Sequence, residues 1–217
     1  MDRVYMFLSG PLTWAAFAVL VLGSAWRVVR LVRLARIKDA VVFDDFRPGW
    51  ASVSILRWLL PLNVTAATRP LFSLVGYGFH VCLLCVAIFL SAHVALWEQA
   101  FGLTWPTLPD ELADWLTLAV LGCAAVFAVR RVVLPRVRAL TNGADWLALM
   151  LAAAPFVTGY AAHQQWWDYE LMLCLHVASG LVLLAAVPFT KLSHVFLFFV
   201  SRAVAGSDFG KRKVGAW

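Results

Sequence analysis

Residues 70–97 read PLFSLVGYGFHVCLLCVAIFLSAHVALW, an apolar stretch without one Asp, Glu, Lys or Arg. A helix of about 20 residues is long enough to cross the roughly 30 Å hydrocarbon core of a bilayer. Four more apolar stretches of spanning length occur, at residues 8–26, 112–129, 144–162 and 169–200. Solid runs indicate helices rather than the alternating strands of a membrane barrel. The sequence therefore predicts an all-α fold: a polytopic membrane bundle of five transmembrane helices in a single integral membrane domain, 1–217.

The composition excludes most other classes of protein. Of the 217 residues, 63% are hydrophobic and only 14% are charged, whereas soluble domains are about 25% charged. These proportions rule out a disordered tail, a disulfide-rich secreted domain and an ordinary cytosolic enzyme.

The basic residues predict the orientation of the bundle. Seventeen of the 18 Lys and Arg residues lie in segment 27–69, in segment 130–143 or from Lys191 onward, and Arg3 alone lies opposite. The positive-inside rule then places the N-terminus outside and the C-terminus in the cytoplasm. Segment 27–69 becomes a basic cytoplasmic loop, in which residues 53–62 are expected to form an interfacial helix. Topology and anionic membrane lipid explain the net charge of +6, so no nucleic-acid partner is expected.

The histidines are the strongest functional signal. All five, at positions 80, 93, 163, 176 and 194, lie in or at the ends of predicted spans. Ionisable groups in a bilayer are unfavourable and mark functional sites by default, although a neutral histidine can also serve a hydrogen bond between helices.

The spacing of four histidines predicts two paired sites. His176 and His194 are 18 residues apart on the fifth span, which is five helical turns and about 27 Å on one face. His80 and His93 on the second span are about 20 Å apart. Because the two spans are antiparallel, His80 comes level with His194 on the cytoplasmic side and His93 with His176 on the outer side. Two bis-histidine haems need this arrangement, and iron with both axial positions filled transfers electrons rather than activating oxygen.

One feature of the second span complicates this prediction. Thirteen residues leave His80 and His93 about 140° apart on an ideal helix. A π-bulge or a bend, favoured by Gly76 and Gly78, would bring them onto one face. Alternatively, His163 replaces His93 as a ligand.

The chain resembles a known family in these positions. Phe79-His80, Ala92-His93-Val94 and a fifth span with His176 and His194 resemble the gamma subunit of respiratory nitrate reductase, a dihaem cytochrome b that oxidises quinol. The similarity is greater to the cytochrome b subunits of sulfate-reducer transmembrane redox complexes. That likeness is carried by PFVTG at 155–159, PFTKLSH at 188–194 and the segment from Ser201-Arg202 to Phe209-Gly210.

The resemblance implies a function in electron transport. The chain would be an electron-transfer subunit of a quinone-linked oxidoreductase complex in the bacterial inner membrane, with two haem b groups and menaquinone as exchangeable substrate. Its implied partners are a cytoplasmic heterodisulfide-reductase-like iron–sulfur subunit and a periplasmic multihaem cytochrome c. The competing hypothesis is a non-redox membrane protein, either a metal-ion transporter or a structural anchor of a complex.

Further residues are expected to support these cofactors. Lys191 and Arg202 lie where they could pair with anionic haem propionates, or they extend to the lipid headgroups. By analogy with the nitrate reductase subunit, the quinone site is expected near the outer haem. Its candidate residues are His163, Gln164, Tyr160 and Trp166.

Overall fold

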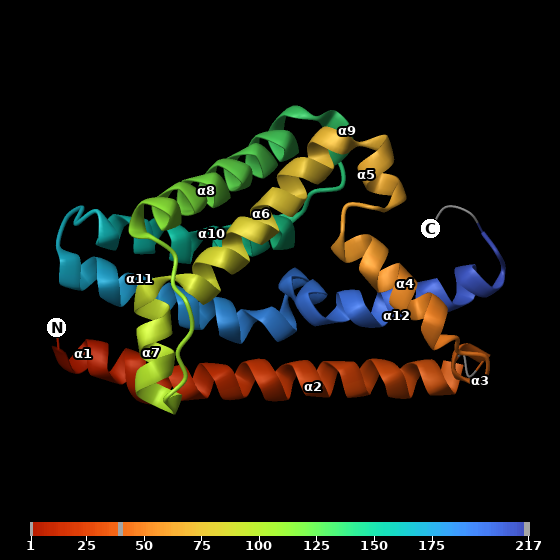
Figure 1. The fold of residues 1–217 in the computed structure, drawn as a ribbon, viewed down its shortest axis with the longest axis horizontal. Coiled ribbons are helices and arrows are strands. Elements are labelled where there is room, and N and C mark those ends of the chain that lie inside the picture. Colours follow the sequence, from red (N-terminus) through yellow and green to blue (C-terminus); the bar gives the residue numbers. More distant parts are fainter. Residues whose placement is uncertain (1, 39–40, 215–217) are drawn as a thin grey trace. The chain divides into compact units, whose positions relative to one another are not determined.

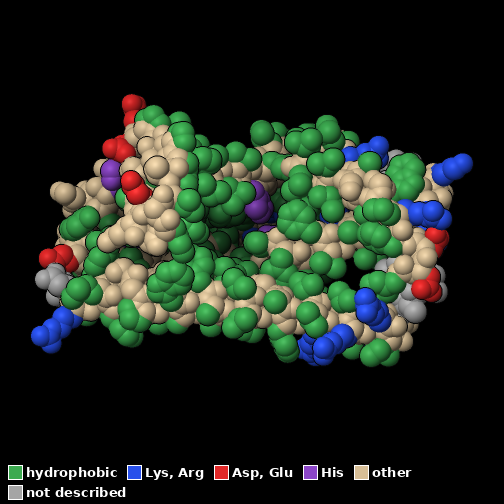
Figure 2. All heavy atoms as spheres, turned by 60° about the horizontal axis from the view of Figure 1, so that its bottom comes forward, with side chains coloured by type: hydrophobic (Ala, Val, Ile, Leu, Met, Phe, Trp, Pro, Cys, Tyr) green, Lys and Arg blue, Asp and Glu red, His purple; other side chains and the backbone are tan. Residues whose placement is uncertain are grey.

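The computed structural model describes residues 2–38 and 41–214, and these residues form helices without any strand. Residues 1, 39–40 and 215–217 of the predicted domain and loop lie outside the described residues. Five helices are long and apolar enough to cross a membrane, which confirms the expected fold class. They are Arg3–Lys38, Pro70–Phe89, Asp110–Val133, Gly143–His163 and Tyr169–Phe189. Apolar side chains are spread over the whole of the face drawn in Figure 2, as expected of helices that contact lipid.

The first helix is longer than the apolar run that predicts it. It begins as α1 (Asp2–Phe7), passes through a π-helical turn at Leu8–Leu12 and continues as α2 (Thr13–Lys38). The expected span ends at residue 26 because hydropathy falls at Arg27. Arg, Leu and Val after that point remain compatible with a helix, so α2 continues for three more turns.

The chain forms two compact units. The first contains residues 2–5 and 74–180, and the second contains residues 6–73 and 181–214. In the first unit, α8 (Asp110–Val133) packs on α10 (Gly143–His163). The buried residues of α8 are Ala113, Thr117, Val120 and Ala124. This stripe of small side chains lets the helices approach closely, as is common in membranes.

The second predicted span is not one helix. It divides at Leu90, whose backbone is extended (φ −65°, ψ 132°), into α6 (Pro70–Phe89) and α7 (Ser91–Phe101). Helix α7 turns sharply away from α6 (Figure 1). The expected distortion near Gly76 and Gly78 is absent from α6, which is regular there. The 140° angle of an ideal helix therefore does not apply to His80 and His93.

In the second unit, α4 (Pro48–Leu59) lies along α12 (His194–Lys211) (Figure 1). The expected interfacial helix at 53–62 begins earlier, because Pro48 supplies a favourable first helical residue. Gly206 and Gly210 face Ser54 and the indole of Trp50, so that a Cβ on either glycine would collide with them.

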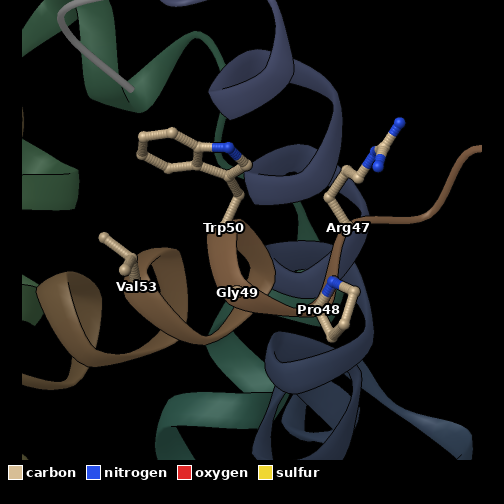
Figure 3. A pocket seen from close by; sticks show the side chains of 5 residues that line it. All are labelled: Arg47, Pro48, Gly49, Trp50 and Val53. Carbon is tan, nitrogen blue, oxygen red and sulfur yellow. The ribbon is translucent and has the colours of Figure 1, made fainter.

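Short elements complete this second unit. Helix α3 spans Val41–Asp44 and α5 spans Val64–Thr68, while the four-residue α9 (Pro135–Arg138) belongs to the first unit. Figure 3 shows a shallow hollow at the start of α4. It is lined by Arg47, Pro48, Gly49, Trp50 and Val53, and it contains none of the predicted site residues.

The fifth predicted span is also divided. Helix α11 (Tyr169–Ala186) ends at two short 3-10 turns, η2 (Val187–Phe189) and η3 (Lys191–Ser193), and α12 begins at His194. Pro188 has no N–H to continue the helix, and Thr190 is extended (φ −116°, ψ −174°). The prediction that His176 and His194 share one face of a single helix is therefore wrong.

Candidate functional site

His93 and His176 lie together in the first unit. Their imidazole planes are parallel within 4°, and their ring centroids are 6.0 Å apart. His93 comes from the first turn of α7 and His176 from the middle of α11. The structure thus brings together the two histidines that the sequence pairs on the outer side.

The division at Leu90 puts His93 in this position. The His93 ring turns back toward the end of α6, where its Nδ1 donates to the carbonyl oxygen of Ala87 at 2.9 Å. His163, the alternative ligand, instead lies with its Nε2 3.5 Å from Oδ1 of Asp114. The geometry therefore favours His93 over His163 as the partner of His176.

Residues of α10 hold the His176 ring in position. Nδ1 of His176 donates to the carbonyl oxygen of Pro155 at 2.8 Å. The bare Cα of Gly159 faces the ring so closely that an added Cβ would lie 2.8 Å from Nδ1 and 2.9 Å from Cε1. One turn further along α11, the Ser179 hydroxyl donates to the His176 carbonyl at 2.9 Å and contacts the Thr158 hydroxyl at 3.2 Å. The PFVTG segment thus fixes both the ring and the backbone of His176.

The other two predicted ligands are described within their own units. His80 lies on α6, and its Nδ1 donates to the carbonyl oxygen of Gly76 at 2.7 Å. The Phe79 ring contacts it edge-on, at a centroid distance of 5.3 Å. His194 opens α12, and its Nδ1 donates to the carbonyl oxygen of Lys191 at 3.0 Å.

All four predicted ligands share one hydrogen-bonding pattern. In each, Nδ1 faces a backbone carbonyl, which can only accept, so the proton of the neutral imidazole lies on Nδ1. Metal-ligating histidines commonly donate their other ring N–H to an acceptor in this way. His163 differs because its Nε2 faces a carboxylate.

Arg27 and Gly23 of α2 contact the break before His194. Arg27 on α2 donates through Nη1 to the carbonyl oxygen of Pro188 at 2.6 Å and to that of Thr190 at 3.5 Å. The Cβ that Gly23 lacks would lie 2.9 Å from Cγ of Pro188. Together, these two residues of α2 hold the turn that presents His194.

The two predicted propionate partners have different surroundings. Lys191 begins the 3-10 turn before His194. The Arg202 guanidinium lies over the Trp58 ring, with its Cζ 4.5 Å from the ring centroid. This cation–π contact gives Arg202 a packing role between α4 and α12.

The predicted quinone residues gather around Asp114 and Trp166. Nε2 of Gln164 donates to Oδ2 of Asp114 at 2.9 Å, beside the contact that His163 makes with Oδ1. The Tyr160 and Trp166 rings meet edge-on at a centroid distance of 5.6 Å. The end of α10 thus holds an acid–base pair next to an aromatic pair.

Three residues that contact these sites have no role in the expectations drawn from the sequence: Arg27, Asp114 and Gly159. Gly159 did have a sequence signal, since it lies in the PFVTG segment. Among the described residues there is no group of three or more His, Cys, Asp or Glu side chains that could hold a metal ion.

No family model matches the sequence. A protein of Nitratidesulfovibrio vulgaris (strain Hildenborough) is 38% identical over 219 residues, which cover 98% of this chain and 96% of that protein. Its name, "Protein", states no activity. The similarity extends through both compact units.

Proposed function

This chain belongs to the family of the N. vulgaris protein, and we propose that it is a membrane cytochrome b subunit. In this proposal two bis-histidine haem b groups pass electrons between menaquinol or menaquinone and partner redox subunits. The five candidate membrane spans support a multi-pass location, which we assign to the bacterial inner membrane, with the N-terminus outside.

The geometry of His93 and His176 is the observation that carries the proposal. The two imidazole rings are stacked parallel, with their centroids 6.0 Å apart, so two candidate axial ligands stand next to each other. They would hold the iron of a haem, whose porphyrin would supply the remaining ligands.

The surrounding residues prepare these imidazoles as ligands. The carbonyls of Ala87 and Pro155 hold the proton on Nδ1 of each ring, which orients Nε2. Gly159 leaves room for the His176 ring where any Cβ would displace it. Haem iron held between two imidazoles supplies one-electron transfer without an open coordination site.

From their spacing in the sequence, His80 and His194 remain our proposed ligands of a second haem. Within its own unit, each carries the same Nδ1–carbonyl pattern. Lys191 and Arg202 are the proposed propionate partners of this haem. On the opposite side of the membrane we place quinone near His163 and Gln164. The carboxylate of Asp114, 3.5 Å from Nε2 of His163, would hold this imidazole in place beside the quinone.

The proposed partners follow the same assignment of sides. A cytoplasmic heterodisulfide-reductase-like iron–sulfur subunit and a periplasmic multihaem cytochrome c would exchange electrons with the two haems. Basic side chains from Lys191 onward would meet an acidic iron–sulfur partner by charge complementarity.

The visible spectrum of the purified, dithionite-reduced protein tests this function. We expect a b-type haem spectrum and about two haems per chain by pyridine haemochrome assay. The variant His176→Ala should lose one haem and keep the other, whereas His163→Ala should keep both. A wild-type protein without haem would instead indicate a metal-ion transporter or a structural anchor.

A further inference from the structure

The end of α6 carries an unusual set of hydrogen bonds. A helix that stops leaves its last four carbonyls without intrahelical partners, and in a membrane each unpaired carbonyl is unfavourable. Because the chain is extended at Leu90, the amides of residues 91–93 open α7 and do not bond to the carbonyls of Ala87, Ile88 and Phe89.

Three donors from other parts of the first unit replace those amides. Nδ1 of His93 bonds to the carbonyl of Ala87 at 2.9 Å, and the Trp105 indole N–H bonds to that of Ile88 at 3.0 Å. The Leu108 amide bonds to the carbonyl of Phe89 at 2.8 Å. The candidate ligand His93 is thus one of three groups that together cap α6.

The loop between α7 and α8 brings Trp105 to this cap. Helix α7 ends at Phe101 and is capped by Gly102, whose φ of +69° suits glycine. From there the chain returns along α7 (Figure 1). The Trp105 ring then packs against Trp97 of α7, at a centroid distance of 6.1 Å, and Trp97 packs against Phe101 at 5.0 Å.

We propose that Trp105 is a positioning residue for the axial ligand His93. Its indole N–H fixes the carbonyl of Ile88, which is adjacent to the carbonyl that holds the His93 ring. Trp105 thereby sets the angle at which α7 leaves α6, and with it the plane of the His93 imidazole relative to that of His176. This inference rests on the proposed haem between His93 and His176.

The test compares Trp105→Phe, which removes the indole N–H, with Trp97→Phe as a matched control. Trp97 belongs to the same aromatic cluster, and its indole makes no hydrogen bond within the described part of the chain. The readouts are the low-spin ferric EPR signal and midpoint potential of each haem, together with haem retention on dilution in detergent. His176→Ala identifies which signals belong to the His93–His176 haem.

In Trp105→Phe we expect both haems to be incorporated. The His93–His176 haem should change its EPR anisotropy and midpoint potential, and it should be retained about 10-fold less tightly, as is typical when a residue supporting a ligand is lost. The other haem, and both haems of Trp97→Phe, should be unchanged.

Three results would overturn the positioning role. They are unchanged signals in Trp105→Phe, equal changes in Trp97→Phe, and joint loss of both haems from Trp105→Phe, which would indicate a role in folding of the whole chain. Absence of haem from the wild-type protein is a separate outcome, since it refutes the proposed function itself.

Discussion

Replacing Gly159 by Ala adds a single methyl group that would press against the His176 ring. The added carbon would lie 2.8 Å from Nδ1 and 2.9 Å from Cε1 of His176, whereas carbon atoms pack best at about 3.5–4.0 Å. Either the ring or α10 must therefore move by at least about 0.6 Å. Nδ1 also makes the 2.8 Å hydrogen bond to the carbonyl of Pro155 on the same helix, so a ring displaced from Gly159 would disturb this bond.

The size of the effect follows from the cost of overpacking. Extra methyl groups in well-packed sites cost about 1–3 kcal/mol, which corresponds to roughly 5- to 150-fold in an equilibrium constant. We expect Gly159→Ala to weaken retention of the His93–His176 haem within that range. The haem assigned to His80 should be unaffected.

Haem content and EPR of the purified variants measure this effect. Gly122→Ala is the matched control, because it makes the same change on α8 where a Cβ meets nothing within 4 Å. Both substitutions gain similar helix propensity, about 1 kcal/mol, so the comparison isolates the collision. If Gly159→Ala matched Gly122→Ala in haem content and in both EPR signals, the proposed packing of Gly159 on the ligand would be refuted.

Two other predictions concern the second unit. Arg27→Met removes the donor to the carbonyl of Pro188, which should lower the free energy of unfolding by about 1–3 kcal/mol. It should also shift the midpoint potential of the proposed His194 haem and of no other. An unchanged potential would count against a role for Arg27 in holding the turn. The hydrogen bond from Lys211 lowers the pKa of the Asp45 carboxyl. The ionised carboxylate therefore stabilises the folded state at pH values above the unfolded pKa of about 3.9. This stabilisation is lost as the pH falls through the lower pKa of the folded state. Thermal unfolding should therefore show Asp45→Asn less stable than wild type at neutral pH and equal to it in strong acid, and a difference independent of pH would contradict the assignment.

The membrane spans were predictable because apolar length is a local property of the sequence. The break in the fifth span had a local signal too, since Pro188 interrupts helical hydrogen bonding. The break at Leu90 had none: it lies inside an apolar run, and the donors that make it tolerable, Trp105 and Leu108, lie a loop away. A one-dimensional pattern does not record such an exchange of hydrogen-bond partners.

The sequence predicted which residues form the candidate site better than it predicted how they are arranged. His93 and His176 were paired from their depths along two spans, and the structure places them together. The route by which they meet depends on the divided helix, which the ideal-helix angle could not anticipate. The pairing of His80 with His194 and the orientation of the bundle remain predictions.

In each of the four imidazoles, Nδ1 donates a hydrogen bond to a main-chain carbonyl oxygen rather than to a carboxylate. A point mutation changes a side chain and leaves the main-chain carbonyl in place, so it does not remove this hydrogen-bond acceptor. If the proposed haems are present, evolution would adjust their redox potentials through neighbouring side chains and helix ends, while the main-chain support of the ligands stayed constant.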